Sequence, residues 1–452
     1  MRGQPAFVGV ECLAMEFTTF DQVISYMDGF TNLEKRTDKY SNRTYRLDRM
    51  QALMEALGHP ERAYKTIHVA GSKGKGSTAS YIASGLSALG FRTGLYMSPH
   101  VSDYRERFTL CGRFIDDADL VSTGNYLASF VSDFHFSDGI GEEKPTTFEL
   151  YTAFAFLLFK RIGCQWAVIE TGLGGRLDAT NILLPEASVI TPIELEHTEI
   201  LGGTISLIAT EKSKIIKANR PSFSAFQTDE ALTVLRAEAA SVSSSFHYIG
   251  DYVSSVSVSG TSAHIEFVDG YIADLDLAMA GLVQAQNCAL ALLVLRSLGL
   301  YSSGVSEAAL SANRLPGRME LVHWKRPLYL DGAHTENSMA ALINTFRSVF
   351  PGRGGICIFG AVSGKNHLAM AKLVLSAFDT VVISRPGTFK KNDPKALYEL
   401  VLSLKKPSQT VVLLEDASEA LSFCLSHTTE SEGILAAGSF YLAGAIKEAL
   451  CL

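Results

Sequence analysis

The stretch HVAGSKGKGSTAS, residues 68–80, joins the end of an apolar run to a loop rich in glycine and lysine. Phosphate-binding loops of the pattern G-x-x-x-x-G-K-[ST] carry a hydroxyl residue directly after the lysine. Here Gly76 separates Lys75 from Ser77, so the spacing is one residue longer than that pattern. The stretch is either a plain turn between a strand and a helix or a phosphate loop with one additional residue.

The segments around this loop alternate between short apolar runs and amphipathic stretches. TIHVA (66–70) indicates a buried strand, and STASYIASGLSALG (77–90) indicates a helix that ends at Gly90. Further runs of strand length are RTGLYMS, WAVIET and ASVITPI, and TTFELYTAFAFLLFKRIG indicates a long apolar helix (92–98, 166–171, 187–193 and 146–163). Continuous apolar strands are typical of a parallel sheet covered on both faces, so we predict a doubly wound, mostly parallel α/β sheet.

The pattern changes at residues 241–277, where polar and apolar residues alternate and turn pairs occur. Such alternation predicts a small antiparallel sheet, and the apolar stretch after it predicts a helix over 280–299. SANRLPGRMELV (311–322) has the composition of a linker, with a turn at Pro316-Gly317.

A second α/β alternation follows, with predicted strands in PLYLDG, GICIFGAV, TVVISRP, TVVLLE and GILAAGS. It predicts a separate Rossmann-like domain of about 130 residues. This unit lacks G-x-G-x-x-G, so its pattern gives no reason to infer a dinucleotide. We place the domains at 1–312, with 1–14 as an extension ahead of the fold, and at 323–452, joined by a linker at 313–322.

Composition narrows the class of protein. Of the 452 residues, 47% are hydrophobic and 19% charged, and the formal net charge of −7 argues against a nucleic-acid surface. The seven cysteines are scattered, without a CxxC or Cys/His cluster, so we expect reduced thiols and no zinc site. There is no signal-peptide pattern and no apolar run near the roughly 20 residues that span a bilayer. We expect a cytoplasmic monomer that binds neither nucleic acid nor membrane.

Polar residues stand where the predicted strands of the first sheet end. The glycine-rich loop follows the first strand, Ser98 the second and Glu170 the third, and His197 lies shortly after the fourth. Ligands of open α/β sheets bind beyond these carboxyl ends. A hydroxyl and a carboxylate beside a phosphate loop are the hard ligands that Mg²⁺ prefers, so the sequence predicts a nucleotide site with magnesium.

Each of these features also has a simpler interpretation. Glu170 can be a satisfied charge at a strand end, and His197 a polar loop residue, because magnesium prefers oxygen donors. Lys212 in ATEKSKIIK can be a solvated helix lysine, and Asp331 with His334 in YLDGAH can form a turn after a strand.

Taken together, the motifs closely resemble those of the folylpolyglutamate synthase and dihydrofolate synthase family within the Mur-ligase superfamily. The phosphate loop of that superfamily is G-T-[NK]-G-K-G-[ST], and GSKGKGS fits it with Ser72 in place of threonine. The additional glycine is therefore the spacing of the family. The resemblance also rests on YMSPHVSDYRERF, ETGLGGRLDATNI, ITPIELEHTEILGGTISLIATEKSKIIK, LPGRME and DGAHTENS, and it runs from YRLDRM to GSFYLAGAIK.

The resemblance implies a role for individual residues. ATP would bind to Lys73, Gly74, Lys75, Gly76 and Ser77, with further contacts from Asn287, Arg318 and Asp331. Mg²⁺ would bind to Ser98, Glu170 and His197, and Lys212 matches a lysine that is carbamylated in relatives. The pterin-bearing substrate would lie near Thr146, Thr147, Phe148, Glu149, Leu177, Asp178 and Ala179. Lys75, Glu170, His197 and Lys212 are the residues expected to carry catalysis.

The sequence also departs from the family pattern. Glu194 replaces a glycine and Glu196 an aspartate before His197, and Lys214 lies in EKSKI where EKAGI is usual. Thr335 stands where asparagine is common, and SGKN (363–366) replaces D-K-D. The last two departures concern the glutamate side of the site.

The resemblance implies an ATP-dependent amide ligase that adds L-glutamate to dihydropteroate, to the tail of a reduced folate, or to both. The reaction would pass through an acyl phosphate, with glutamate bound between the two domains. One alternative is a Mur-type ligase of cell-wall precursors, although only about 65 residues precede the loop and an additional domain is usual there. The other is a folate- or nucleotide-binding homologue with altered catalysis.

Overall fold

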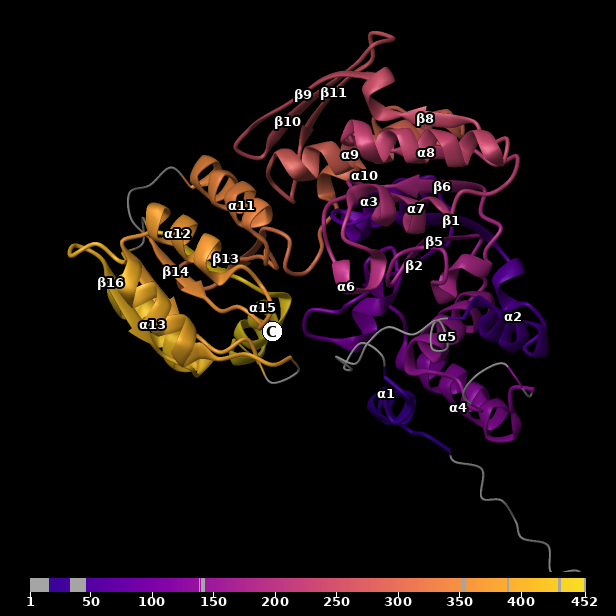
Figure 1. The fold of residues 1–452 in the computed structure, drawn as a ribbon, viewed down its shortest axis with the longest axis horizontal. Helices are drawn as coiled ribbons and strands as arrows, with labels where there is room; N and C mark the ends of the chain where they lie inside the picture. Colours follow the sequence, from indigo (N-terminus) through magenta and orange to yellow (C-terminus); the bar gives the residue numbers. More distant parts are fainter. Residues whose placement is uncertain are drawn as a thin grey trace, which may run out of the picture.

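The computed structural model describes residues 16–32, 46–137, 139, 143–350, 355–387, 390–429 and 432–450. Two α/β units lie side by side, and the C-terminal one is drawn in orange and yellow (Figure 1). No helix within these ranges is long and apolar enough to cross a membrane.

The N-terminal unit is organised around an eight-stranded sheet of order β4-β3-β2-β5-β1-β6-β7-β8. In this spatial order, the neighbouring strands β2, β5, β1, β6, β7 and β8 are all parallel. At the other edge, β3 pairs antiparallel with β2, and β4 pairs antiparallel with β3. The predicted doubly wound, mostly parallel sheet is therefore confirmed. The strands are β1 Lys65–Ala70, β2 Thr93–Tyr96, β3 Phe108–Leu110, β4 Arg113–Phe114, β5 Trp166–Glu170, β6 Ala187–Ile190, β7 Ser222–Ser224 and β8 Phe246–Tyr248.

Helices cover both faces of this sheet, which explains why its central strands are apolar throughout. In β5, Trp166 and Val168 pack on the side of α3 and α9, whereas Ala167 and Ile169 pack on the side of α5. Burying a valine or isoleucine side chain contributes about 1.5–3 kcal/mol, so both faces favour apolar residues. The helices are α1 Phe20–Asp28, α2 Leu47–Ala56, α3 Lys75–Ala88, α4 Asp117–Asp133, α5 Thr147–Arg161, α6 Thr198–Leu201, α7 Ile205–Ser213, α8 Asp229–Ser241, α9 Leu282–Ser297 and α10 Val305–Ala312.

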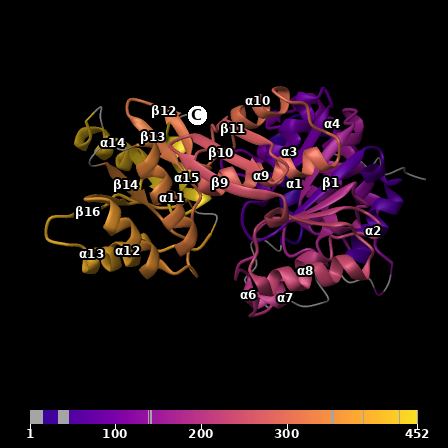
Figure 2. The ribbon, with the colours of Figure 1, turned by 90° about the horizontal axis from the view of Figure 1, so that it is seen from above.

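The predicted small antiparallel sheet is present and has three strands. β9 (Val253–Ser259), β10 (Ser262–Phe267) and β11 (Ile272–Asp276) pair in the order β11-β10-β9. Figure 2 shows them beside α9 and on the side of the C-terminal unit. β8, although it falls within 241–277, instead pairs parallel with β7 at the edge of the large sheet, where the His247 ring stacks on Phe223.

The C-terminal unit has a six-stranded sheet of order β12-β13-β17-β14-β15-β16, parallel except for β12. β12 begins at Glu320, inside the segment expected as a linker, and Lys447 of α15 binds the Glu320 carboxylate at 2.9 Å. The domain limits given above stay predictions. The elements are β12 Glu320–His323, β13 Pro327–Leu330, α11 Glu336–Val349, β14 Ile356–Phe359, α12 His367–Ala377, β15 Thr380–Ile383, α13 Pro394–Leu404, β16 Thr410–Leu413, α14 Ala417–His427, β17 Ile434–Ala437 and α15 Phe440–Ala449.

Candidate active site

The glycine-rich loop connects β1 to α3 and is shaped by its close neighbours. A Cβ added to Gly71 would lie 1.9 Å from Thr191 Oγ1, and one added to Gly74 would lie 2.4 Å from Asn287 Oδ1. Gly74 also has a left-handed backbone with φ of 80°. Only glycine fits both positions, and the loop leads into the N-terminus of a 14-residue helix. The backbone N–H groups of such a first turn are suited to bind a phosphate.

Glu170 ends β5 beside this loop and is buried. Its Oε1 lies 3.9 Å from Lys75 Nζ, and its Oε2 accepts a hydrogen bond from Ser98 N at 3.2 Å. Burial raises the pKa of Glu170, while Lys75, the Ser98 N–H and Arg318 act in the opposite direction. The predicted ends of β1, β2 and β5 therefore meet at one carboxylate.

The donors around Glu170 fit a magnesium ion. Mg²⁺ usually takes one or two protein oxygens and completes its shell with water and substrate phosphates. Within the described residues, no three His, Cys, Asp or Glu side chains gather closely enough to hold a metal by themselves. The Glu170 carboxylate offers a hard oxygen of the kind that this partial ligation requires, and Ser98, whose N–H binds it, carries a hydroxyl. A cation there would also favour the ionised form of the buried carboxylate.

His197 lies at the start of α6, next to the loop region, in a left-handed conformation with φ of 46°. Its side chain is half-exposed, and its Nδ1 lies 3.8 Å from Glu199 Oε1. Burial lowers the pKa of His197, and the charges of Glu196, Lys365 and Lys75 act on it. His197 is therefore within electrostatic reach of the phosphate loop, although its nearest acidic partner is Glu199.

Lys212, on α7, is buried directly beneath the loop. Its Nζ donates to Gly71 O at 2.7 Å and to Glu196 Oε1 at 3.0 Å. Burial lowers the pKa of Lys212 to about 8, against the effect of Glu196. Burial by itself would raise the pKa of Glu196, but Lys75 and Lys212 outweigh it and the pKa is about 2. Lys212 is thus a buried lysine of the site and not a solvated helix residue.

The remaining nucleotide predictions converge from α9 and from the C-terminal side. Asn287 contacts Gly74 and accepts a hydrogen bond from Thr78 at 3.4 Å. The Arg318 guanidinium lies 4.4 Å above the Phe440 ring. Burial lowers the pKa of Arg318, against the charges of Asp331 and Glu170. Asp331 accepts hydrogen bonds from Met319 N and Ala333 N, both at 2.8 Å, so its carboxylate ties the end of β13 to the residue that follows Arg318.

The C-terminal unit also contributes two residues that carried no assigned role. Burial lowers the pKa of His334 to about 3, and the positive charge of Lys73 in the loop lowers it further, so the ring is neutral at physiological pH. Lys365 acts electrostatically on Lys73, His197 and His334. The sequence marked 363–366 only as a departure from the family. The sequence around Lys365 does not indicate a role in the site, because its nearness to Lys73 and His197 depends on how the second unit lies against the first.

The predicted substrate residues at 146–149 mainly stabilise the start of α5. The Thr146 hydroxyl accepts from Glu149 N at 3.3 Å, and Glu149 Oε2 accepts from Thr146 N at 2.7 Å, which is a capping box. Glu149 also pairs with the buried Arg49 at 2.9 Å. Thr147 donates to Met27 O at 3.0 Å. Phe148 differs, because its ring packs against Gly172 in the loop that follows β5.

The second predicted substrate segment lies in the same loop. The buried Asp178 accepts hydrogen bonds from Leu173 N at 2.8 Å and Thr180 N at 3.0 Å, and so fixes residues 172–178. Leu177 and Ala179 on either side are half-buried. The backbone of this loop, with Phe148 beside it, is available to contact a substrate near Glu170.

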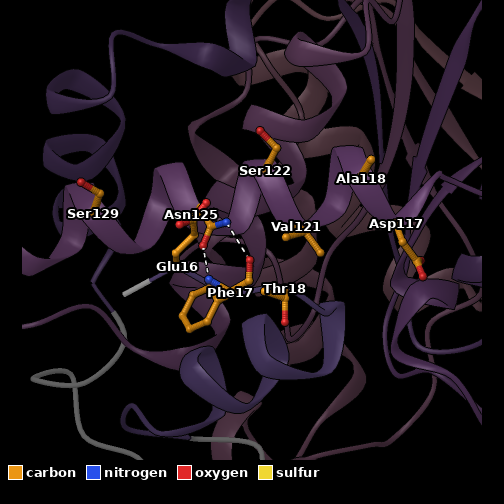
Figure 3. Close-up of a pocket in the computed structure, with 9 residues that line it drawn as sticks. All are labelled: Glu16, Phe17, Thr18, Asp117, Ala118, Val121, Ser122, Asn125 and Ser129. Atoms are coloured by element: carbon orange, nitrogen blue, oxygen red, sulfur yellow. Dashed lines mark hydrogen bonds between the residues drawn. The ribbon is translucent and has the colours of Figure 1, made fainter. Parts of the chain in front are cut away.

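Two surface cavities lie elsewhere. Figure 3 shows one of about 560 Å³ between Glu16–Thr18 and helix α4, where Asn125 binds the backbone N and O of Phe17 at 2.7 and 3.0 Å. The other, of about 640 Å³, is lined by Lys65, Trp166 and neighbouring residues at the amino ends of β1 and β5. Neither cavity includes a predicted site residue.

Comparisons with known proteins agree with this arrangement. Residues 69–295 match the Mur ligase middle domain, and residues 317–440 match the Mur ligase glutamate ligase domain. The chain is 32% identical to the dihydrofolate synthase/folylpolyglutamate synthase of Bacillus subtilis, over 89% of this chain and 94% of that protein. The crystal structure of folylpolyglutamate synthase from Thermotoga maritima matches with a TM-score of 0.81 and 30% identity, over 96% of each chain. Folylpolyglutamate synthase of Mycobacterium tuberculosis, complexed with ADP and AMPPCP, matches with a TM-score of 0.82 and 28% identity, over 95% and 97%.

Proposed function

Since this chain belongs to the dihydrofolate synthase/folylpolyglutamate synthase family of Mur ligases, we propose that it is an ATP-dependent ligase that adds L-glutamate to a pteridine carboxylic acid. The acid is dihydropteroate, the glutamate tail of a reduced folate, or both. The observation that carries the proposal is the meeting of the phosphate loop, Glu170 and Arg318 at one place.

The reaction must activate a carboxylate, because its anion does not react with an amine at neutral pH. Transfer of the γ-phosphoryl group from ATP to a carboxylate oxygen yields an acyl phosphate and ADP. The amino group of glutamate then attacks the acyl carbon, loses a proton and expels phosphate, which leaves an amide. The protein's contribution to such a reaction is largely positioning and charge neutralisation.

The residues of the first unit suit the phosphoryl transfer. The N–H groups from Lys73 to Ser77 would hold the phosphates, and the Lys75 ammonium would offset their charge. Asn287, Arg318 and Asp331 are proposed nucleotide residues. Ser98, Glu170 and His197 would hold Mg²⁺, which when bound reduces the repulsion between phosphate and substrate carboxylate.

Lys212 is proposed to be carbamylated, as the family resemblance implies. The neutral amine and CO₂ form a carbamate anion and release one proton. The lowered pKa of Lys212 increases the fraction of the neutral amine that this reaction needs. The product would place an anion where Lys212 now contacts Gly71 O and Glu196.

Glutamate would bind where the second unit faces the loop, near His334 and Lys365, since the Lys365 ammonium suits its carboxylates. The acid substrate would lie against the loop 172–178 and Phe148. Closure of the two units would exclude the water that hydrolyses an acyl phosphate.

We also propose that the enzyme works as a cytoplasmic monomer. Light scattering after gel filtration tests the oligomeric state.

The deciding experiment measures ADP release with dihydropteroate and tetrahydrofolate offered separately, each with and without L-glutamate. We expect release only when an acid and glutamate are both present. ADP release in the absence of the acid or of glutamate contradicts the proposal. So does the absence of ADP release when each acid is offered together with glutamate. Lys75→Ala should abolish release but leave binding of the acid measurable, whereas a binding protein without ligase activity would show no release before the substitution.

A further inference from the structure

We propose that His68 and Thr180 are positioning residues that hold Asp178, and through it the loop 172–178, at a fixed place relative to the phosphate loop. The inference rests on the proposed function, in which this loop contacts the pteridine acid. None of the three side chains needs to touch the substrate for the effect.

The three side chains form one buried chain of hydrogen bonds. His68 Nε2 lies 2.7 Å from Thr180 Oγ1, and Thr180 Oγ1 lies 2.5 Å from Asp178 Oδ1. All three residues are at most 5% exposed. The chain thus connects the middle of β1 to a 3₁₀ turn, η3 (Ala179–Ile182), on the far side of the substrate loop.

The hydrogen bonds that Asp178 accepts determine which atom is the donor in each bond of this chain. Its Oδ2 accepts from Leu173 N and its Oδ1 from Thr180 N, so the carboxylate acts as the acceptor for the Thr180 hydroxyl as well. With its proton donated to Asp178, the Thr180 oxygen is left to accept a bond from His68. His68 must therefore carry its proton on Nε2.

The other ring nitrogen of His68 is consistent with this tautomer. Nδ1 is buried and has no hydrogen-bond partner among the residues that the structure describes. A proton there would be an unsatisfied buried donor, and Nε2 and the Thr180 oxygen would then face each other as two acceptors. Burial lowers the pKa of His68 to about 3, so the ring stays neutral at physiological pH.

The position of this chain of hydrogen bonds explains how it affects catalysis. His68 lies three residues before Gly71, where the phosphate loop begins, and it pairs in register with Ile169, next to Glu170. Asp178 accepts from Leu173 at one end of the substrate loop and from Thr180 just beyond the other. The distance between the nucleotide and the acid substrate therefore depends on His68 and Thr180. A change of this distance slows phosphoryl transfer without weakening ATP binding.

The test compares paired variants at two positions. His68→Gln and Thr180→Ser keep a donor or hydroxyl in place, whereas His68→Leu and Thr180→Val remove it. We expect the latter two to raise KM for the acid about tenfold and to lower kcat, with KM for ATP changed less than about threefold, because one buried hydrogen bond is lost. His68→Gln and Thr180→Ser should stay within about threefold of the wild type. The acid is whichever of dihydropteroate and tetrahydrofolate supports turnover in the wild type.

Tyr64→Phe is the matched control, because it removes a buried hydrogen bond to Phe156 O in the same unit but away from the loop. It should lower Tm without changing either KM. If Thr180→Val lowers Tm as Tyr64→Phe does and leaves KM for the acid unchanged, the chain is structural only and the inference is wrong. A His68→Leu protein that does not fold leaves the Thr180 pair to decide.

A second readout does not depend on activity. The ¹⁵N chemical shifts of the His68 ring, assigned with His68→Gln, should report the neutral Nε2–H tautomer from about pH 6 to about pH 9. A proton on Nδ1, or titration within that range, overturns the proposed chain. Absence of ADP release in the wild type would contradict the proposed function but leave this measurement valid.

Discussion

The nucleotide side and the acid side of the site differ in what their polar side chains contact. Lys73 and Lys75 of the phosphate loop and Glu170 beside them lie around the space where ligands of such sheets bind. Thr146, Glu149 and Asp178 on the acid side instead bind the backbone of their own segments. One side is thus made of side chains that can contact a ligand, and the other of side chains that shape a surface. A sequence motif does not by itself distinguish these two uses.

The largest expected effect tests the structural side of this comparison. Glu149→Gln keeps the shape of the side chain but removes the negative charge that pairs with the buried Arg49. We expect the free energy of unfolding to fall by about 3–5 kcal/mol, because one partner of a buried ion pair is removed. Chemical denaturation measures it, and KM for the acid should be unchanged in the folded fraction. Thr146→Ser, which retains the cap, is the control. A large rise in KM with little loss of stability would show that Glu149 contacts the substrate.

Glu170→Gln tests the ligand-binding side. It removes the negative charge that faces Lys75 and the proposed magnesium while keeping the volume. We expect kcat to fall by about 10²–10³, since one group that stabilises developing charge is lost, with Tm unchanged or raised because a buried carboxylate is costly. Steady-state ADP release and thermal unfolding measure the two effects. Normal turnover in this variant would remove Glu170 from the catalytic residues.

The pKa of Lys212 leads to a prediction about pH. Below about pH 8 most of the side chain is the ammonium, which does not attack CO₂, and above it the neutral amine predominates. At constant dissolved CO₂ the carbamate signal in ¹³C NMR should therefore rise from about pH 7 to about pH 9. Lys217 is the matched control, because burial lowers its pKa to about 8 as well, while its Nζ binds Asn181 O and Oδ1 instead of Gly71 O and Glu196. The signal should persist in Lys217→Arg and vanish in Lys212→Arg; the reverse outcome assigns the carbamate to Lys217.

The sequence was sufficient for the fold because both faces of the central sheet are covered, which makes its strands apolar throughout. It failed for β8, since three residues are too few to show a period and the edge position is set by pairing with β7. The proximity of the loop, Ser98 and Glu170 was predictable because strand ends of a parallel sheet meet at one edge. TTFE also fits the capping pattern [ST]-x-x-[DE], so the structural use of Thr146 and Glu149 had a signal in the sequence. Lys365 had none, because its position depends on the contact between the two units.

A substitution of Phe440 has the smallest expected effect. Phe440 combines the two uses compared above, because it is an apolar residue that shapes the site and also supports a charged residue, Arg318, proposed to bind the nucleotide. Its ring lies 4.4 Å below the Arg318 guanidinium and packs so closely on Gly332 that a Cβ there would be 2.2 Å away. Phe440→Leu keeps an apolar side chain but removes the ring face, which contributes about 0.5–2 kcal/mol to a stacked cation. We expect KM for ATP to rise about 3- to 10-fold, whereas Phe440→Tyr should stay close to the wild type. Phe423→Leu, which removes a ring stacked on His427 in α14, is the control and should leave KM unchanged. Equal KM values for Phe440→Leu and the wild type would mean that Arg318 is positioned by Asp331 and Glu170 alone.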